Sequence, residues 1–196
     1  MNTLVACDFF AKDIVTPFGR KTAYCLFFIH LVSRRVFICP STYHPDRRWV
    51  TQQARNVMMW LDDAGIEPRF LLRDRDAKFS TSFDQVFRDA GVRIVKTPVQ
   101  APNANAFAET WVAAVKRECL CHFVCFGRRH LDHVLRHYVA YFNEHRPHQG
   151  LGNRTLPEAA TGPPETRDSG DPDALDRIRC RRFLGGLLRH YYREAA

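Results

Sequence analysis

Acidic residues within or directly after apolar stretches are the first candidates for chemistry in this chain. The stretch "TLVACDFFA" places Asp8 in an otherwise apolar run, and "RFLLRDRDAKF" ends a second apolar run in Asp74 and Asp76. A carboxylate buried without a partner is costly, so Asp8 needs a cation, a polar partner or a raised pKa. The alternative for Asp8 is a residue at a strand end that faces water.

A third acid, Glu109, lies in the otherwise uncharged stretch "NANAFAETWVAAV". Lys116 follows seven residues later, about 20° away around a helix of 3.6 residues per turn, so both would share one helix face. A metal ligand is one interpretation of Glu109. The other is an acid that stabilises the start of a helix through the helix dipole.

Alternating apolar patterns and turn residues predict the elements that would position these acids. Three strands joined by short turns are expected to pair antiparallel, at residues 3–11, 21–31 and 34–43. The remaining predicted elements are a helix over 46–64, a strand over 69–74, a helix over 80–90, a strand over 92–98, and helices over 105–123 and 131–143.

This order of elements predicts an α/β fold in which helices flank a mixed five-stranded sheet. We expect the core domain to span residues 1–160. Residues 161–175, "TGPPETRDSGDPDAL", are rich in Pro, Gly and acids and are typical of a linker. Residues 176–196 form a basic C-terminal extension that mixes Arg with aromatic residues, as nucleic-acid-binding surfaces do. The alternative is a packed C-terminal strand and helix.

The composition favours a polyanionic partner. The chain carries a formal net charge of +8, and 24 of its 29 basic residues are Arg, which binds phosphate in a bidentate manner. A solvated basic surface is the alternative. The longest apolar run, residues 25–32, is too short to cross a membrane. Seven Cys without a regular framework and a start unlike a signal peptide favour reduced thiols in a cytoplasm.

Two clusters of possible metal ligands are weaker candidates. The stretch "CLCHFVC" gathers Cys119, Cys121, His122 and Cys125, but only Cys121 and Cys125 would share a helix face, and no second Cys pair follows as in common zinc sites. His residues also line one side of the next predicted helix, where a solvated or phosphate-facing stripe is the alternative to metal binding.

Together the three acids resemble the catalytic core of DDE integrases and transposases, a family with the ribonuclease H-like fold. The family's second acid begins a D-x-G-x-x-F pattern, which "DRDAKF" matches from Asp74 to Phe79 except that Asp76 replaces the glycine. The third acid of the family follows about 35 residues later, and here 109 minus 74 is 35.

Further motifs carry the same resemblance, which covers about residues 3 to 158. The family's P-x-x-N-x-x-x-E-x-x-x-x-x-x-K pattern is matched by Pro102, Asn105, Glu109 and Lys116. The stretch "YFNEHRPHQGLGNRTLPE" is similar to the ending of bacterial insertion-sequence transposases. That ending is carried by Tyr141, Asn143, Arg146, Pro147, His148 and Leu151.

The resemblance implies a metal-dependent polynucleotidyl transferase that cleaves DNA ends and transfers strands. Asp8, Asp74 and Glu109 would hold Mg²⁺ or Mn²⁺, as two ions about 3.5–4 Å apart that clamp an in-line displacement. The residues implied to contact DNA are Lys116, Asn105, Arg146 and His148. A bacterial cytoplasmic homo-oligomer is expected, with a separate helix-turn-helix subunit that reads the transposon ends.

Two alternatives to the transferase stay open. One is a catalytically inactive or domesticated module for DNA binding and oligomerisation, and the other is a ribonuclease H-like nuclease that cuts without joining. Within the opening motif, the spacings to Phe79 and Glu109 favour Asp74 as the ligand. Asp76 is then expected in the turn, with a positive φ and a side chain that bonds the local backbone.

Overall fold

The structure is a computed structural model that describes residues 4–97, 106–162 and 178–193. The chain divides into two compact units, residues 1–135 and 136–196, and the division falls inside helix α4 (Gly127–Glu144). The expected domain end at residue 160 stays a prediction. The expected linker lies almost wholly outside the described residues.

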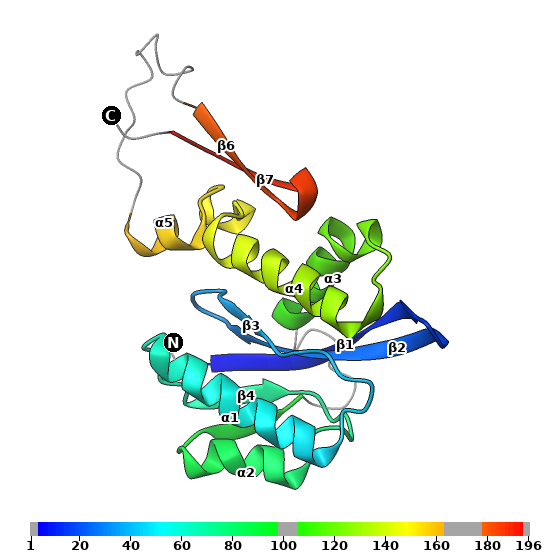
Figure 1. The fold of residues 1–196 in the computed structure, drawn as a ribbon. Coiled ribbons are helices and arrows are strands. Elements are labelled where there is room, and N and C mark those ends of the chain that lie inside the picture. Colours follow the sequence, from blue (N-terminus) through cyan, green and yellow to red (C-terminus); the bar gives the residue numbers. More distant parts are fainter. Residues whose placement is uncertain (1–3, 98–105, 163–177, 194–196) are drawn as a thin grey trace. The chain divides into compact units, whose positions relative to one another are not determined.

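A five-stranded mixed sheet, in the order β3-β2-β1-β4-β5, forms the centre of the first unit (Figure 1). Strands β1, β2 and β3 pair antiparallel, whereas β4 lies parallel to both β1 and β5. This confirms the predicted fold class. The strands are β1 (Leu4–Thr16), β2 (Gly19–His30), β3 (Val36–Ile38), β4 (Phe70–Arg73) and β5 (Arg93–Lys96).

The helices begin and end close to where capping residues predict. Helix α1 follows Asp46, whose side chain accepts a hydrogen bond from the Trp49 amide at 2.8 Å, and α2 follows Ser80 in the same way. The described helices are α1 (Arg47–Asp63), α2 (Thr81–Asp89), α3 (Ala106–Glu118), α4 and α5 (Leu156–Ala160). None of the helices in the described ranges is long and apolar enough to cross a membrane.

Two helix boundaries and one helix predicted from the sequence were wrong. Helix α3 ends at Glu118 rather than near residue 123, because the chain tightens there into a 3-10 turn, Leu120–His122. Helix α4 begins at Gly127, before the apolar stripe from which its start was predicted at residue 131. In the C-terminal extension, the alternative of a packed strand and helix is wrong for the described residues 178–193, where β6 (Ile178–Phe183) and β7 (Leu188–Arg193) pair as an antiparallel hairpin.

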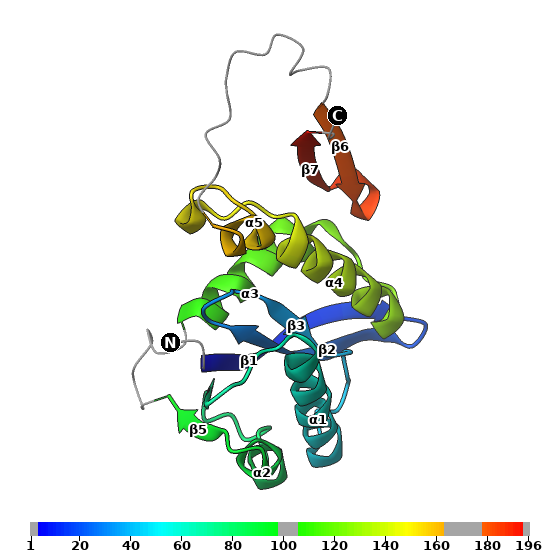
Figure 2. The same ribbon diagram turned by 90° about the vertical axis from the view of Figure 1, so that its left-hand side faces the viewer.

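Helices cover both faces of the sheet (Figure 1, Figure 2). Helices α1 and α2 lie on one face and α3 on the other. On the α3 face, the Trp111 ring packs against Phe27 of β2 at a centroid distance of 4.3 Å and against Phe10 of β1 at 5.9 Å. The core on the α1/α2 face includes Val5, Cys7, Leu26, Phe28, Val50, Ala54, Val57, Leu61, Leu71, Phe83 and Phe87.

Side-chain alternation along β1 therefore determines where Asp8 points. Successive side chains of a strand leave opposite faces of the sheet. Val5 and Cys7 belong to the core under α1 and α2, whereas Phe10 contacts Trp111 of α3. Asp8 shares the parity of Phe10 and so lies on the α3 face.

A buried ion pair joins the end of β4 to α2. The Arg73 guanidinium donates to both carboxylate oxygens of Asp84, at 2.9 and 2.7 Å, and both side chains are buried. The same guanidinium donates to the main-chain carbonyl of Asp74 at 2.8 Å and lies over the Phe79 ring. One buried cation thus fixes the peptide that carries the predicted ligand Asp74.

Removing one partner of this pair should cost far more than removing both. Asp84→Leu leaves a buried guanidinium without its carboxylate, and we expect a loss of about 3–5 kcal/mol in unfolding free energy by urea titration. Arg73→Met combined with Asp84→Leu should recover most of that loss. Asp89→Leu, on the exposed side of α2, is the control, with an expected change within about 0.5 kcal/mol. Equal losses for the single and double variants would contradict the pairing.

Candidate active site

Asp8 and Asp74 lie at equivalent positions on neighbouring parallel strands. The register pairs Leu4 with Phe70 and Ala6 with Leu72. Two residues further along each chain stand Asp8, still within β1, and Asp74, directly after the last residue of β4. Side chains two residues apart on a strand leave the same face of the sheet. Asp8 and Asp74 therefore share the face of Ala6 and Leu72, which is the α3 face, at the end of β4.

Helix α3 brings Glu109 toward the same edge. Phe27 stands opposite Asp8 in the β1–β2 ladder, and Trp111 of α3 stacks on Phe27. Glu109 lies two residues before Trp111, in the first turn of α3, and its side chain is exposed beside the buried stripe of the helix. The sheet and α3 thus supply the three predicted acids from three separate elements.

The pKa of Asp8 is affected by the neighbouring acids. Burial, reinforced by the negative charges of Asp74, Glu109 and Asp76, raises the pKa of the Asp8 carboxyl from its usual 3.8 to about 6. A hydrogen bond from the Phe9 amide, 2.7 Å from Asp8 Oδ1, opposes the shift. The ionised form of Asp8 is therefore disfavoured unless a positive charge approaches it.

Asp76 forms the turn that follows β4. Its Oδ1 accepts from the Lys78 amide at 2.8 Å, and its Oδ2 pairs with Lys78 Nζ at 2.6 Å. Asp74 Oδ1 in turn accepts from the Asp76 amide at 3.0 Å. The predicted bonding of Asp76 to the local backbone is confirmed. The predicted positive φ is wrong: Asp76 is not among the described non-glycine residues with positive φ, because side-chain bonds hold the turn instead.

Two cations beside the acids were missed by the sequence analysis. Lys78 neutralises Asp76 and lies over the rings of Phe9 and Tyr24, at 5.4 and 5.5 Å from their centroids. Arg73 holds the Asp74 carbonyl. The available signals in the sequence were Arg73, directly before Asp74, and Lys78, two residues after Asp76. Only the tertiary structure identifies their partners.

The predicted DNA-contacting residues are distributed over both units. Lys116 is exposed near the end of α3, whereas Asn105 lies outside the described residues. In the second unit, the Arg146 guanidinium lies 5.5 Å from the Phe142 ring centroid. His148 is 5% exposed, packs edge-on against Phe142 and forms a β-bridge with Arg154. The fold thus gives His148 a packing role, and its contact with DNA stays a prediction.

The described residues contain no group of three or more His, Cys, Asp or Glu side chains positioned, as they lie, to hold a metal ion. This holds for the three acids and equally for the Cys119–Cys125 stretch. The donor chemistry of the acids nevertheless fits a hard divalent cation, because carboxylate oxygens are its preferred ligands. The disfavoured charge on Asp8 is what such a cation would neutralise.

Comparison with solved structures shows that this fold, of the ribonuclease H-like class, is similar to the fold of integrase catalytic cores. The HTLV-2 integrase catalytic core domain in complex with magnesium matches with a TM-score of 0.60 and 10% identity, over 81% of this chain and 95% of that chain. The BIV integrase catalytic core matches with a TM-score of 0.56 and 12% identity, over 81% of this chain and 93% of that chain.

A chain of the simian T-cell lymphotropic virus intasome, in complex with PP2A regulatory subunit B56 gamma, matches with a TM-score of 0.61 and 12% identity. That match covers 97% of this chain and 66% of the other. Residues 90–155 also match the family model of the integrase core domain. No curated protein sequence matches the chain. The fold is thus similar to that of integrase catalytic cores, and part of the chain, residues 90–155, matches the integrase core domain family.

The raised pKa of Asp8 predicts a specific pH dependence of stability. Because the folded protein binds the Asp8 proton more tightly than the unfolded chain does, this carboxyl makes folding less favourable as pH rises from about 3.8 to about 6. In metal-free buffer, Asp8→Asn should therefore gain unfolding free energy relative to wild type between pH 4 and pH 7.5. Urea titrations at both pH values measure this difference.

A difference between wild type and Asp8→Asn that does not change with pH would contradict the burial and repulsion inferred for Asp8. Asp63→Asn at the exposed end of α1 is the matched control, and its difference from wild type should stay constant across the same range.

Proposed function

We propose that this protein is a metal-dependent polynucleotidyl transferase that acts on DNA ends. The observation that carries the proposal is the in-register pairing of β1 and β4 as far as Ala6 and Leu72, which supports a position of Asp8 beside Asp74 on the face of the sheet that α3 covers. Three carboxylates from two strands and a helix are a donor set for Mg²⁺ or Mn²⁺. The match to the integrase core family supports DNA as the substrate.

In this proposal Asp8, Asp74 and Glu109 hold the metal. When bound, divalent ions activate the attacking hydroxyl and stabilise the leaving oxygen of the phosphodiester. The residues of the chain fix the ligands: β1 holds Asp8 rigidly, and Arg73 fixes the main chain at Asp74. Glu109, being exposed, has the freedom to rotate toward a cation that Asp8 and Asp74 approach from the sheet.

Lys78 is proposed to keep Asp76 out of the ligand set. Its ammonium group already pairs with Asp76 and is held over two aromatic rings. Asp76 therefore stands close enough to affect the pKa of Asp8 but carries its own counterion. This separates the two aspartates of the "DRD" stretch by role, with Asp74 at the metal and Asp76 in the turn.

Similar solved structures support the proposals on metal use and oligomerisation. The HTLV-2 integrase core has been solved with magnesium in dimeric and trimeric forms. We propose a homo-oligomer here as well, with transposon ends read by a separate helix-turn-helix subunit.

Substitution of the two neighbouring aspartates should separate their roles. With labelled DNA ends and Mn²⁺, we expect Asp74→Asn to lower cleavage by several orders of magnitude, since a metal ligand is lost. Asp76→Asn should remain measurable because it keeps a backbone acceptor, and Asp76→Gly should keep most activity. Nicked and joined products resolved on denaturing gels provide the measurement.

Metal binding is followed in parallel, so that inactive protein is not mistaken for unfolded protein. Millimolar Mn²⁺ should raise the melting temperature of wild type and leave Asp74→Asn unchanged. An active Asp74→Asn with an inactive Asp76→Asn would place the ligand two residues away from the proposed one. Nicking without joining would favour the nuclease, and metal binding without any cleavage would favour the inactive module.

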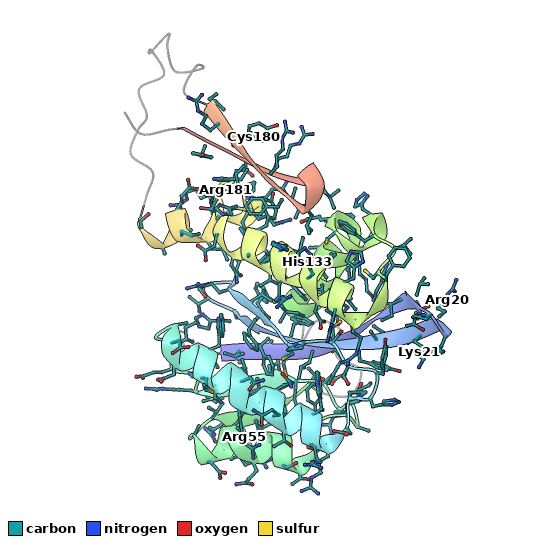
Figure 3. The ribbon with its side chains drawn as sticks, in the orientation of Figure 1. Arg20, Lys21, Arg55, His133, Cys180 and Arg181 are labelled. Atoms are coloured by element: carbon teal, nitrogen blue, oxygen red, sulfur yellow. The ribbon has the colours of Figure 1, made fainter. Side chains whose placement is uncertain are left out.

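Binding to DNA should depend steeply on salt and only weakly on sequence, because Arg and Lys contacts with phosphate release counterions. Lys116→Ala should lower the slope of log affinity against log salt by about one, measured by fluorescence anisotropy. Arg55→Ala removes one positive charge from α1, on the opposite face of the sheet (Figure 3), and should leave the slope unchanged. Equal slopes for both variants and wild type would remove Lys116 from the interface.

A further inference from the structure

The hairpin of β6 and β7 has two faces of different chemistry. Its antiparallel register pairs Arg181 with His190 and Cys180 with Tyr191. Since residues directly opposite share one face and successive residues alternate, these two pairs lie on opposite faces. Figure 3 labels Cys180 and Arg181, the neighbours on β6 that mark the two faces.

One face of the hairpin packs within its own unit. The Phe183 ring lies 5.4 Å from Tyr141 and 5.0 Å from His145, as centroid distances. His190 lies 4.8 Å from His145, and Tyr192 stacks on His190 at 5.8 Å. Tyr141 and His145 come from the end of α4 and the residue after it. This face therefore packs against the end of α4 through Phe183 and His190, while Arg179, Arg181 and Tyr192 on the same face stay exposed.

The opposite face is exposed. Cys180, Arg182 and Arg189 are exposed, and Tyr191 is 60% exposed. Arg182 stands directly opposite Arg189, whose guanidinium donates a hydrogen bond to the Gly186 carbonyl at 3.4 Å. Neither strand contains an Asp or Glu. We call this surface, made of Cys180, Arg182, Arg189 and Tyr191, the outer face.

We propose that the outer face binds an unpaired DNA strand, with a base stacked on Tyr191 and phosphates held by Arg182 and Arg189. An exposed aromatic ring beside a pair of guanidinium groups matches the alternation of base and phosphate along a single strand. Bases within a duplex are already stacked on one another, so Tyr191 would have no ring to contact there. The choice of DNA as the polymer rests on the proposed function, but binding itself needs none of the three acids.

Binding by the full chain in EDTA tests this proposal. The probes are a fluorescent oligothymidine of about 16 nucleotides and an abasic strand of equal length and charge, followed by anisotropy. We expect wild type to bind the oligothymidine about tenfold more tightly than the abasic strand. Tyr191→Leu should abolish that preference and Tyr191→Phe should keep it. Tyr192→Leu is the matched control and should retain the preference, because Tyr192 lies on the other face of the hairpin and its ring is stacked on His190.

Charge is tested with two variants of equal net charge. Arg182→Gln with Arg189→Gln removes two guanidinium groups from the outer face, and Arg179→Gln with Arg181→Gln removes two from the other face. We expect the first pair to weaken oligothymidine binding several-fold more than the second. Equal weakening by both pairs would mean that only bulk charge matters and would overturn the proposal.

The chain's own thiols provide a footprint that does not depend on substitution. Cys180 stands opposite Tyr191 on the outer face, and Cys121 is an exposed thiol in the first unit. Bound oligothymidine should slow iodoacetamide alkylation of Cys180 and leave Cys121 unaffected, as measured by mass spectrometry. Unchanged alkylation of Cys180 at saturating strand would contradict the proposal.

Competitors and activity separate the remaining possibilities. A blunt duplex that binds with the same dependence on Tyr191, or polyglutamate that protects Cys180 equally, would overturn the assignment to an unpaired strand. Mn²⁺-dependent cleavage is measured separately on Tyr191→Leu. If wild type binds the unpaired strand but does not cleave DNA, the binding proposal holds and the proposed activity is contradicted. If wild type cleaves DNA but does not bind the unpaired strand, only the binding proposal is contradicted.

Discussion

Parallel pairing between β1 and β4 is the constraint on which the candidate site depends, because it fixes which residues of two distant segments become neighbours. Ala6 pairs with Leu72, so the chain positions 8 and 74 meet although 66 residues separate them. A shift of the register by one residue would turn one carboxylate to the opposite face of the sheet. The apolar residues of β1 and β4 prevent such a shift, since their alternating side chains are buried against α1 and α2 on one side.

The buried Arg73–Asp84 pair adds a second constraint at the same place. Strand β4 ends at Arg73, so Asp74 has no ladder partner of its own to hold it. The guanidinium supplies that restraint by binding the Asp74 carbonyl while Asp84 anchors it to α2. The buried Arg73 guanidinium, neutralised by Asp84 of α2, thus fixes the main chain of Asp74, whose carboxylate lies on the other face of the sheet. Such an arrangement keeps the positive charge near Asp74 without occupying its carboxylate.

Sequence patterns predicted a mixed five-stranded sheet with flanking helices, because strands and capped helices follow from local periodicity. The pairing of Asp8 with Asp74 could be expected once β1 and β4 were taken as neighbours. Three features could not be predicted in this way. The ion pair of Arg73 and the attachment of Lys78 to Asp76 depend on tertiary contacts. The turn at Asp76 avoids a positive φ because side-chain hydrogen bonds replace the glycine conformation, which no spacing reveals.

The electrostatics of the candidate site and of the hairpin differ, and under the two proposals this difference determines when each surface could bind DNA. At the sheet edge, burial and repulsion make the charge of Asp8 unfavourable, so that region is completed only by an added cation. On the outer face of the hairpin, guanidinium groups remain solvated and need only phosphate. Phosphate would be repelled by the bare acids and attracted by the hairpin. A DNA strand should therefore associate with the hairpin whether or not metal is present, and engage the sheet edge only after the acids have been neutralised. Metal occupancy, rather than DNA affinity, would then decide when the strand enters the acidic site.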